Sequence, residues 1–426
     1  MARTTHIIGA GLAGLAAAVE LAMRGESVVV HEATSTAGGR CRSYYDHSVG
    51  MMIDNGNHLL LSGNRAALDF LRVLGAKHRL IGPPTAAFPF IDLAKRQHWT
   101  LRFNDGPIPW WIFDPRRRVP DTRAIHYLSL ARLPWAPRDK SVGEVMRFSG
   151  PVYERLVRPL LLAALNIEPA AGSAGLAGAV VRETLLVGGR ACRPLIAREG
   201  LSPTLIEPAL AFLAQRDAPV HFGHQLRGLR YGSGKVAALD FGADSIELAD
   251  DDAVILAVPP YIATALVPGL DVPTEFRAIV NGHFRIEPPA DQPPILGIIN
   301  ATTEWLFAFP GRLSVTISAA DRLLDTPRET LAQTLWNEVS AITGLPATLP
   351  PWQIVRERRA TFAATPEQDA RRPGPQTAWS NLLLAGDWTN TGLPATIESA
   401  IRSGHRAALI ACQRQPHDRP DDRPED

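Results

Sequence analysis

Residues 4–14 read Thr4-Thr5-His6-Ile7-Ile8-Gly9-Ala10-Gly11-Leu12-Ala13-Gly14, and they are the part of the sequence most informative about the fold. The apolar run ending at Ile8 predicts a short buried strand. The alanine- and leucine-rich run after Gly11 predicts a helix that ends near Gly25. The glycines follow the spacing G-x-G-x-x-G. The first permits a tight turn, the second lets a ligand approach the backbone, and the third lets helix and strand pack closely.

An acidic residue stands where this pattern requires one. Glu32 follows a second predicted strand, Ser27 to His31, and can accept hydrogen bonds from the ribose of an adenosine. The free N–H groups and the positive dipole end of the helix suit a pyrophosphate. We therefore expect a dinucleotide here, and the expected contacts are Gly9, Gly11, Leu12, Ala13, Gly14 and Glu32.

A second glycine-rich element selects the type of dinucleotide. Gly38-Gly39-Arg40 allows a backbone nest for anionic oxygens, and Arg40 adds a fixed charge with planar donors. Because this element follows a G-x-G-x-x-G turn and an acid, it favours FAD over NAD. We expect Gly38, Gly39 and Arg40 to contact the cofactor.

A matching element lies near the C-terminus. The short predicted strand at residues 382–385 leads into Gly386-Asp387, and a helix is expected to begin near Ala395. Asp387 can hold ribityl hydroxyls or a water beside the pyrophosphate. The N–H groups at the start of the helix can face the flavin pyrimidine ring, which becomes anionic on reduction. The expected contacts in this element are Gly386, Asp387, Ala395, Thr396 and Ile397.

The order of these elements resembles the amine oxidase and phytoene desaturase superfamily of flavoproteins. Longer stretches resemble one family within it, the bacterial hydroxysqualene dehydroxylases. They are Ile53 to Leu61, Pro159 to Asn166, Trp305 to Phe307, Val315 to Ala320, Arg356 to Pro366 and Ala385 to Glu398. The glycine motifs are common to the superfamily, whereas the last two stretches are far more selective. The resemblance covers nearly the whole chain before its polar tail.

The resemblance implies an α/β fold in which a Rossmann-like FAD-binding domain is interleaved with an α+β substrate domain, as in amine oxidase-like flavoproteins. It implies reductive dehydroxylation of hydroxysqualene to squalene for hopanoid supply, by hydride transfer from reduced flavin to an allylic cation. Asn55, Gly56, Asn57 and Leu226 join the expected FAD contacts, although Asn57 stands where the family has Gln. The external electron donor stays unidentified, and association with squalene-synthase-like enzymes is a further expectation.

This chemistry also needs a proton for the leaving hydroxyl and a pocket that excludes water. His58 is the candidate catalytic residue, as a polar group expected near the flavin, and a structural histidine in a turn is the alternative. Asp54 and Glu398 are weaker candidates, which we expect rather to bind FAD or to cap a helix.

A long isoprenoid substrate needs an apolar tunnel with few polar groups. The expected lining residues are Leu161, Leu165, Trp305, Phe307 and Trp388, with Leu306 and Phe309 from the same runs. Ordinary core packing is the alternative for each. Aromatic faces would also stabilise an allylic cation.

Cofactor-like pieces occur in three separated segments. We predict an FAD-binding domain from residues 1–75, 192–260 and 376–412 and a substrate domain from 76–191 and 261–375, with a disordered tail at 413–426. The proline-rich stretch 261–375 reads as irregular. Residues 232–237 also fit G-x-G-x-x-A, but they lie between two strand-like runs, and a hairpin turn explains them better.

Composition limits the remaining classes. The formal net charge of +1 gives no case for nucleic acid as a partner. The cysteines show neither metal spacing nor a disulfide framework, so a reduced cytoplasmic setting and no metal site are expected. The first strand begins close to Met1 and no apolar run is long enough to span a bilayer, so neither a signal peptide nor a membrane span is expected.

Residues 110–140 mix tryptophans with more basic than acidic residues. This profile is typical of a monotopic membrane contact, and predicts a peripheral location at the inner face of the cytoplasmic membrane. A solvated basic face over a packed core is the alternative.

Two other functions stay open. A carotenoid (phytoene-type) desaturase would use the same cofactor on a similar substrate, but it would oxidise rather than reduce. A prenyl-lipid escort on the same fold would do no redox chemistry. The intact glycine fingerprint with Glu32 argues against the escort, because a protein without a cofactor has no use for it.

Overall fold

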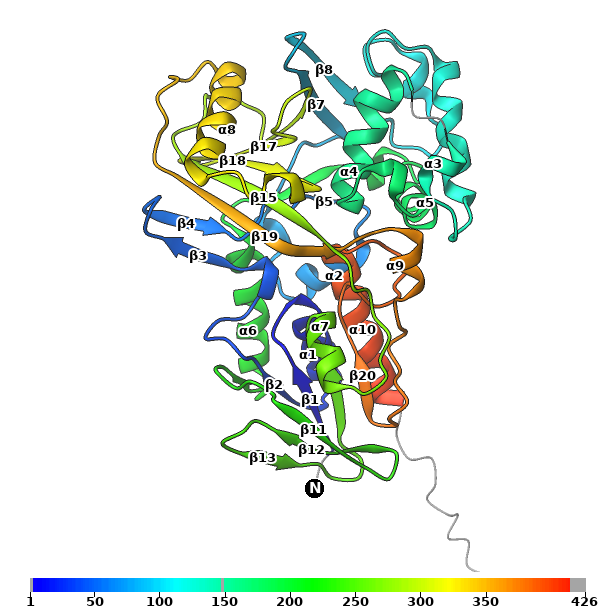
Figure 1. Ribbon diagram of the computed structural model, residues 1–426, viewed down its shortest axis with the longest axis vertical. Coiled ribbons are helices and arrows are strands. Elements are labelled where there is room, and N and C mark those ends of the chain that lie inside the picture. Colours follow the sequence, from blue (N-terminus) through cyan, green and yellow to red (C-terminus); the bar gives the residue numbers. More distant parts are fainter. Residues whose placement is uncertain (1–2, 147–148, 414–426) are drawn as a thin grey trace, which may run out of the picture.

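The predicted first strand and helix are present as β1 (Thr4–Ile8) and α1 (Leu12–Met23). The computed structural model describes residues 3–146 and 149–413. In it, β1 is the centre of a five-stranded sheet with the order β10-β2-β1-β14-β20, and all neighbouring strands are parallel. The other strands are β2 (Ser27–His31), β10 (Val220–His221), β14 (Ala253–Leu256) and β20 (Leu382–Leu384). This sheet lies in the lower half of the molecule (Figure 1).

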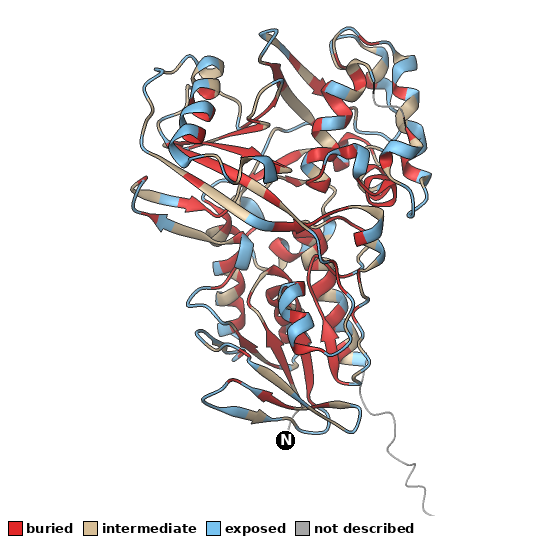
Figure 2. Cartoon of the chain, viewed as in Figure 1, coloured by how far each residue is buried: buried red, intermediate tan, exposed pale blue. Residues whose placement is uncertain are grey.

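Small residues let two helices pack closely beside this sheet. The C-terminal helix α10 (Ile397–Gln413) crosses α1, and a Cβ on Gly404 would lie only 2.1 Å from the carbonyl oxygen of Ala13. Helices α2 (Arg65–Val73) and α6 (Glu207–Ala214) pack beside them. Figure 2 shows that the strands and the facing sides of these helices are buried.

The upper half of the molecule is built on a seven-stranded mixed sheet with the order β19-β15-β18-β17-β16-β7-β8. β16 and β7 pair in parallel, and the other neighbours are antiparallel. The strands are β7 (Ala87–Asp92), β8 (Gln97–Arg102), β15 (Phe276–Arg285), β16 (Ile295–Ile299), β17 (Trp305–Phe309), β18 (Arg312–Ile317) and β19 (Trp352–Phe362). Two sheets with helices around them confirm the predicted α/β fold class.

The prediction that 261–375 is irregular is wrong. This stretch supplies five of the seven strands, with β15 and β19 running for 10 and 11 residues, and the helix α8 (Arg328–Thr343) that packs on the sheet. Its prolines lie between these elements and not within them. Proline density therefore marks the loops, where proline is tolerated, and hides the strands between them.

Short helical segments flank β7 and β8 at the upper right of Figure 1. They are η3 (Trp110–Phe113), η4 (Ala124–Trp135), α3 (Val142–Val145), η5 (Tyr153–Val157), α4 (Arg158–Leu165), η6 (Pro169–Ala171) and α5 (Ala174–Glu183). They bury tryptophan, tyrosine and leucine side chains in a cluster that reaches the seven-stranded sheet.

The remaining strands and α-helices are small. They are β3 (Ser43–Asp46), β4 (Met51–Asp54), β5 (Leu60–Leu61), β6 (Leu80–Ile81), β9 (Pro194–Ala197), β11 (Gly228–Gly232), β12 (Lys235–Asp240), β13 (Ser245–Glu247), α7 (Pro260–Leu266) and α9 (Pro366–Ala370). Gly232 pairs with Lys235 at the end of the β11–β12 ladder. The predicted hairpin turn at 232–237 is therefore confirmed.

The strands of the parallel sheet all fall within the segments predicted for the cofactor domain, while the domain boundaries themselves stay a prediction. Of the predicted tail, Gln413 ends α10, and residues 414–426 lie outside the described part of the chain. Within residues 3–146 and 149–413, no helix is both long and apolar enough to cross a bilayer.

Candidate functional site

The glycine turn between β1 and α1 is shaped by two different constraints. Gly9 has a φ of +105°, and a Cβ there would lie 2.5 Å from the carbonyl oxygen of Ala257. A Cβ on Gly14 would lie 1.9 Å from the carbonyl oxygen of Gly9. A Cβ on Gly11 would meet no described atom within 4 Å. Packing thus explains Gly9 and Gly14, whereas Gly11 faces open space, as a residue that cradles a pyrophosphate should.

The second glycine element lines the same space. The N–H of Gly38 donates to the carbonyl oxygen of Ala10 across 2.8 Å, and Gly38 forms a parallel bridge with Gly11. Gly38 and Gly39 have φ values of +109° and +55°, which glycine adopts without strain. The two motifs that predict the cofactor are therefore adjacent in space.

Glu32 lies beside this turn, at the end of β2. Its carboxylate accepts hydrogen bonds from the N–H of Ala10 at 2.8 Å and from the N–H and hydroxyl of Thr34 at 2.9 and 2.8 Å. The N–H of Glu32 donates to the carbonyl oxygen of His221 across 2.8 Å. This contact places the segment just before Leu226, which is buried, beside the end of β2. The structure thus positions Glu32 next to the glycine turn, and its contact with a ribose stays a prediction.

The N-terminal and C-terminal elements meet through an ion pair. Arg40, in the short helical turn η1 (Gly39–Cys41), donates from Nη2 to Oδ1 of Asp387 across 2.7 Å. Arg40 also donates to the carbonyl oxygen of Ala360 in β19. The attraction of Asp387 raises the pKa of Arg40, so this side chain keeps its charge beside the open glycine turn.

Arg372, which belongs to none of the sequence motifs, stabilises the loop that carries Asp387. The guanidinium of Arg372 is fully buried. It donates to the carbonyl oxygens of Asp387 at 3.3 Å and Trp388 at 3.4 Å. Gly386 has a φ of +150°, and a Cβ there would lie 2.4 Å from Nε1 of Trp388. Arg372 is thus a positioning residue for the loop that bears Asp387.

The segment 54–57 lies against the seven-stranded sheet. Nδ2 of Asn57 donates to Oγ1 of Thr316 across 3.0 Å, and the N–H of Asn57 donates to Oδ1 of Asn281 across 3.3 Å. Nδ2 of Asn55 donates to Glu357 across 3.3 Å. Thr316, Asn281 and Glu357 come from β18, β15 and β19, and the sequence motifs had assigned them no role.

One buried acceptor in this segment has no partner. Oδ1 of Asn57 is buried and makes no hydrogen bond to any described residue. A buried carbonyl oxygen without a donor is costly, and the N–H groups of a flavin ring are donors of the kind it lacks. The open space at Gly11 and this unpartnered oxygen both fit a bound flavin, and their contact with FAD stays a prediction.

Asp54, a weaker catalytic candidate, is tied into the structure. Its carboxylate accepts hydrogen bonds from the hydroxyl of Ser43 at 2.6 Å, the N–H of Leu201 at 2.8 Å and the guanidinium of Arg312 at 3.3 Å. The side chains of Asp54 and Arg312 are 4% and 5% exposed. Asp54 therefore joins β4 to β18 and to residue 201, and has no oxygen left without a partner.

His58, the candidate catalytic residue, follows the segment 54–57 and is half-buried. Its Nε2 lies 3.8 Å from the sulfur of Cys41, which precedes β3. Burial lowers the pKa of His58 to about 4. The imidazole is therefore neutral at neutral pH, so it can position a hydroxyl by hydrogen bonding but holds no spare proton to donate as an acid.

Glu398 caps a helix, which was one of its two expected roles. Its two carboxylate oxygens accept hydrogen bonds from the N–H groups of Ala66 at 3.0 Å and Ala67 at 2.9 Å, in the first turn of α2. Arg402 also contacts it at 2.8 Å. The predicted helix begins at Ile397, so Ala395 and Thr396 immediately precede it, and the Thr396 hydroxyl accepts from the N–H of Ser399 at 3.1 Å.

The predicted substrate residues share one buried cluster. Leu161 and Leu165 lie on α4, Trp305 and Phe307 lie on β17, and Trp388 lies in the C-terminal loop. All five are at most 8% exposed. Their assembly from three distant parts of the chain shows a common apolar environment, and their contact with a substrate stays a prediction.

Leu306 does not belong to this cluster. Side chains alternate along β17, so Leu306 points to the opposite face of the sheet from Trp305 and Phe307. There it packs with Trp336 of α8 in a separate buried cluster. Leu306 is therefore separated from the other expected lining residues, whereas Phe309 lies in the same cluster as Phe307.

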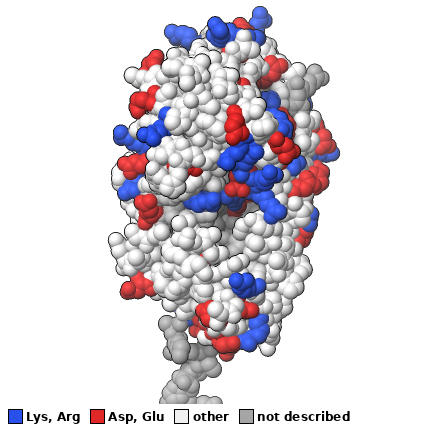
Figure 3. Space-filling model, turned by 60° about the vertical axis from the view of Figure 1, so that its left-hand side comes forward, with Lys and Arg blue, Asp and Glu red and all other residues white. Residues whose placement is uncertain are grey.

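Charge is mixed over the surface. Figure 3 shows acidic and basic side chains interspersed on one face, with basic ones gathered above a hollow at mid-height. Among the described residues, no group of three or more His, Cys, Asp or Glu side chains is arranged to hold a metal ion.

Comparison with known proteins identifies the family. The family of flavin-containing amine oxidoreductases matches residues 12–410. The hydroxysqualene dehydroxylase of Rhodopseudomonas palustris is 60% identical over 409 residues, which cover 96% of this chain and 98% of the relative. That of Sinorhizobium fredii is 56% identical over 411 residues, covering 96% and 99%.

A solved structure agrees in fold. A redesigned putrescine oxidase double mutant has a TM-score of 0.73 at 17% identity, covering 97% of this chain and 100% of its own. At this identity the likeness shows the fold alone. With the full-length similarity and the geometry above, it follows that the chain belongs to the flavin-containing amine oxidoreductases and, within them, to the hydroxysqualene dehydroxylase family, as a flavin-dependent oxidoreductase.

Proposed function

We propose that this protein reduces hydroxysqualene to squalene with FAD as its cofactor. The observation that carries the substrate assignment is 60% identity, over nearly the whole chain, to a relative named hydroxysqualene dehydroxylase. FAD as the particular flavin is supported by the dinucleotide turn with its open face at Gly11 and by Glu32 beside it, because both would be without purpose for a flavin that lacks an adenosine.

Four groups of residues would hold FAD. The glycine turn and helix N-terminus of α1 would bind the pyrophosphate, and Glu32 would bind the ribose. Arg40 and Asp387, joined at 2.7 Å, would sit beside the phosphates and ribityl chain. Asn57 would meet the flavin ring through its unpartnered oxygen.

The reaction breaks the C–O bond of an allylic alcohol, and the oxygen leaves as water after it takes up a proton. FAD in its reduced form would supply the hydride that completes the new C–H bond. The chain must then keep bulk water away from the carbon and tolerate positive charge there. The buried cluster of Trp305 and Phe307 suits both tasks, because aromatic faces attract cations.

We assign His58 the role of positioning the substrate hydroxyl. Its pKa of about 4 makes it a neutral hydrogen-bonding group, so the proton for the leaving oxygen has to come from another group or from water.

The cellular setting that we propose is squalene and hopanoid supply at the inner face of the cytoplasmic membrane. We also propose that an external electron donor reduces the flavin and that the protein associates with squalene-synthase-like enzymes.

Anaerobic incubation of the chemically reduced protein with hydroxysqualene, followed by product analysis, tests this function. We expect squalene. Conversion of a carotenoid precursor with reduction of the oxidised protein would instead establish a desaturase. A purified protein that is colourless and takes up no FAD would establish a prenyl-lipid escort.

A further inference from the structure

Large apolar side chains are exposed together in one part of the structure. We define the apolar patch as Ile108, Trp110, Phe113, Ile125, Leu128 and Trp135, whose exposed fractions are 56%, 62%, 61%, 64%, 62% and 74%. They lie on and around η3 and η4. Soluble proteins rarely expose several such side chains together unless the surface contacts a partner or a membrane.

Buried residues on η3 and η4 fix the orientation of these segments, so that the residues of the apolar patch face solvent. Trp111 of η3 and Tyr127 of η4 are each 6% exposed, and their rings meet edge to face at 5.2 Å. The Tyr127 hydroxyl accepts from the N–H of Val119 across 2.9 Å. Trp110 and Phe113 lie beside each other, with ring centroids 6.1 Å apart. The inward residues fix both segments, so the exposure of the others belongs to the folded state.

Arginines surround the patch, but they fall into two classes. Arg117 donates to the carbonyl oxygens of Arg102 and Phe103, and Arg118 donates to that of Ile112. These two stabilise the loop. The side chain of Arg116 is 89% exposed, and Arg132 is exposed on η4. These two side chains reach solvent, and Arg116 would exchange its ion pair with Asp114, at 3.3 Å, for contact with a ligand outside the protein.

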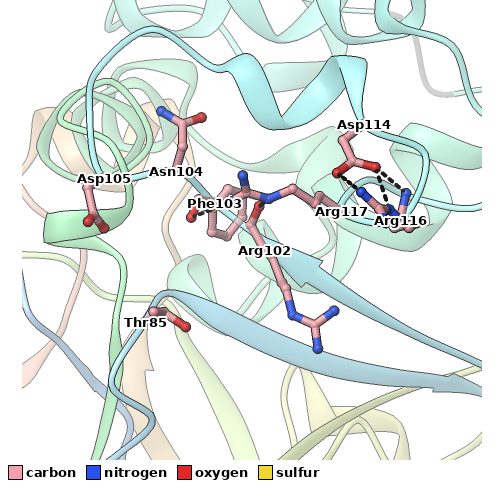
Figure 4. Close-up of a pocket in the computed structure, with 8 residues that line it drawn as sticks. All are labelled: Thr85, Arg102, Phe103, Asn104, Asp105, Asp114, Arg116 and Arg117. Carbon is pink, nitrogen blue, oxygen red and sulfur yellow. Dashed lines mark hydrogen bonds and ion pairs between the residues drawn. The ribbon is translucent and has the colours of Figure 1, made fainter.

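A pocket lined by three arginines and two aspartates includes residues that flank the patch in sequence. Its volume is about 590 Å³, and it is lined by Thr85, Arg102, Phe103, Asn104, Asp105, Asp114, Arg116 and Arg117. Figure 4 shows Arg116 paired with Asp114, while no contact is drawn to the guanidinium of Arg102. A phosphate group is an anion of suitable charge for a free guanidinium at such a site.

The residues that anchor the patch share a buried cluster with the expected substrate residues. Trp111 and Tyr127, which anchor the patch, belong to the same buried cluster as Leu161, Trp305 and Phe307.

We propose that the apolar patch docks on an anionic lipid bilayer. Its aromatic side chains would insert at the headgroup boundary, and Arg102, Arg116 and Arg132 would contact lipid phosphates. The charge around the patch favours a lipid surface over a second copy of the chain, because two copies would bring these arginines together. The use of this surface to take up substrate from the bilayer rests on the proposed function.

Vesicle flotation of the flavin-loaded protein tests the docking without any turnover. The probes are vesicles of phosphatidylcholine alone and vesicles that also contain phosphatidylglycerol, at low and high salt. One variant combines Trp110→Gln, Phe113→Gln and Trp135→Gln, and a second combines Arg116→Glu and Arg132→Glu. The matched control combines Arg65→Glu and Lys77→Glu, which change the same charge at exposed positions on α2 and just after it.

We expect the unmodified protein and the control to float with anionic vesicles at low salt and less at high salt. The arginine variant should lose at least about 25-fold in partitioning, about fivefold for each of the two arginines removed, with a further loss from the two added negative charges. The aromatic variant should not float at all. Equal flotation of all four proteins would overturn the proposal. So would a dimer in light scattering that only the aromatic variant abolishes, together with absence of flotation. Squalene formation from detergent-dispersed substrate tests the enzymatic function separately.

Discussion

Arg40 and Asp387 are 347 positions apart in the chain, yet Nη2 of Arg40 donates to Oδ1 of Asp387 across 2.7 Å. This contact joins the glycine nest that follows β2 to the loop that follows β20. Each element alone is a common motif, and their junction beside the open glycine turn is the observation on which we base the proposed FAD site.

Replacing Asp387 by Asn should weaken FAD binding. The amide keeps the size of the side chain but removes the charge that fixes Arg40. A hydrogen bond between charged groups contributes about 1.5–3 kcal/mol, so the FAD dissociation constant should rise roughly tenfold or more. Titration of the apoprotein with FAD measures it. Glu247→Gln is the matched control, because its ion pair with Arg230 is exposed, with side chains 69% and 60% accessible, and should leave the constant unchanged.

The glycine turn allows a test that separates cofactor binding from folding. Gly11 has φ −72° and ψ 175°, which any residue adopts, and its Cβ position is open. Gly11→Val should therefore yield a folded protein without FAD. Gly14→Ala should unfold more easily, because its Cβ would clash with the Gly9 carbonyl oxygen at 1.9 Å.

Flavin absorbance and thermal melting, measured together, give the answer. The control is Gly374→Val, at another open position, which should keep both its flavin and its melting temperature. A Gly11→Val protein with a full complement of FAD would show that the pyrophosphate does not lie at this turn.

Local motifs predicted the parts of the fold that depend on neighbouring residues. The glycine turn, Glu32 and the final strand with Gly386 were found because a tight turn or a close approach permits few residue types. The long strands β15 and β19 were missed because prolines between them resemble a loop. Arg372, Asn281 and Thr316 were missed because their partners lie far away in sequence and only tertiary packing reveals them.

Glu398→Gln should reduce stability and leave the flavin in place. The carboxylate caps α2 through the N–H groups of Ala66 and Ala67, and loss of a capping group costs about 0.5–2 kcal/mol. Urea denaturation with and without FAD measures the change. Loss of FAD from a variant whose unfolding midpoint is unchanged would instead place Glu398 in the cofactor site.

Stability should fall with acidification below about pH 6.5. Burial, then the neighbouring histidines, lowers the pKa of His31 to about 3, and burial, then Arg312, lowers the pKa of His283 to about 3. In the unfolded chain these histidines have pKa values of about 6.5, so below that pH they bind protons that they do not bind in the folded chain. The free energy of unfolding should thus be highest above about pH 6.5 and decrease by up to about 1.4 kcal/mol per pH unit for each histidine.

Denaturant unfolding at a series of pH values checks this slope. His283→Gln should flatten the pH dependence, whatever it does to stability at neutral pH. Replacement of the exposed His78 by Gln should leave the slope as it is. An identical slope in the His283 variant would remove that residue from the explanation.

In the function that we propose, this chain uses flavin electrons to reduce an allylic alcohol. A single turnover tests it most directly: the flavin-loaded protein is reduced without oxygen, mixed with hydroxysqualene, and assayed for oxidised flavin and squalene in the same sample. We predict one squalene for each flavin oxidised, and none from the Gly11→Val protein. Flavin that stays reduced while the substrate is recovered unchanged would contradict the account.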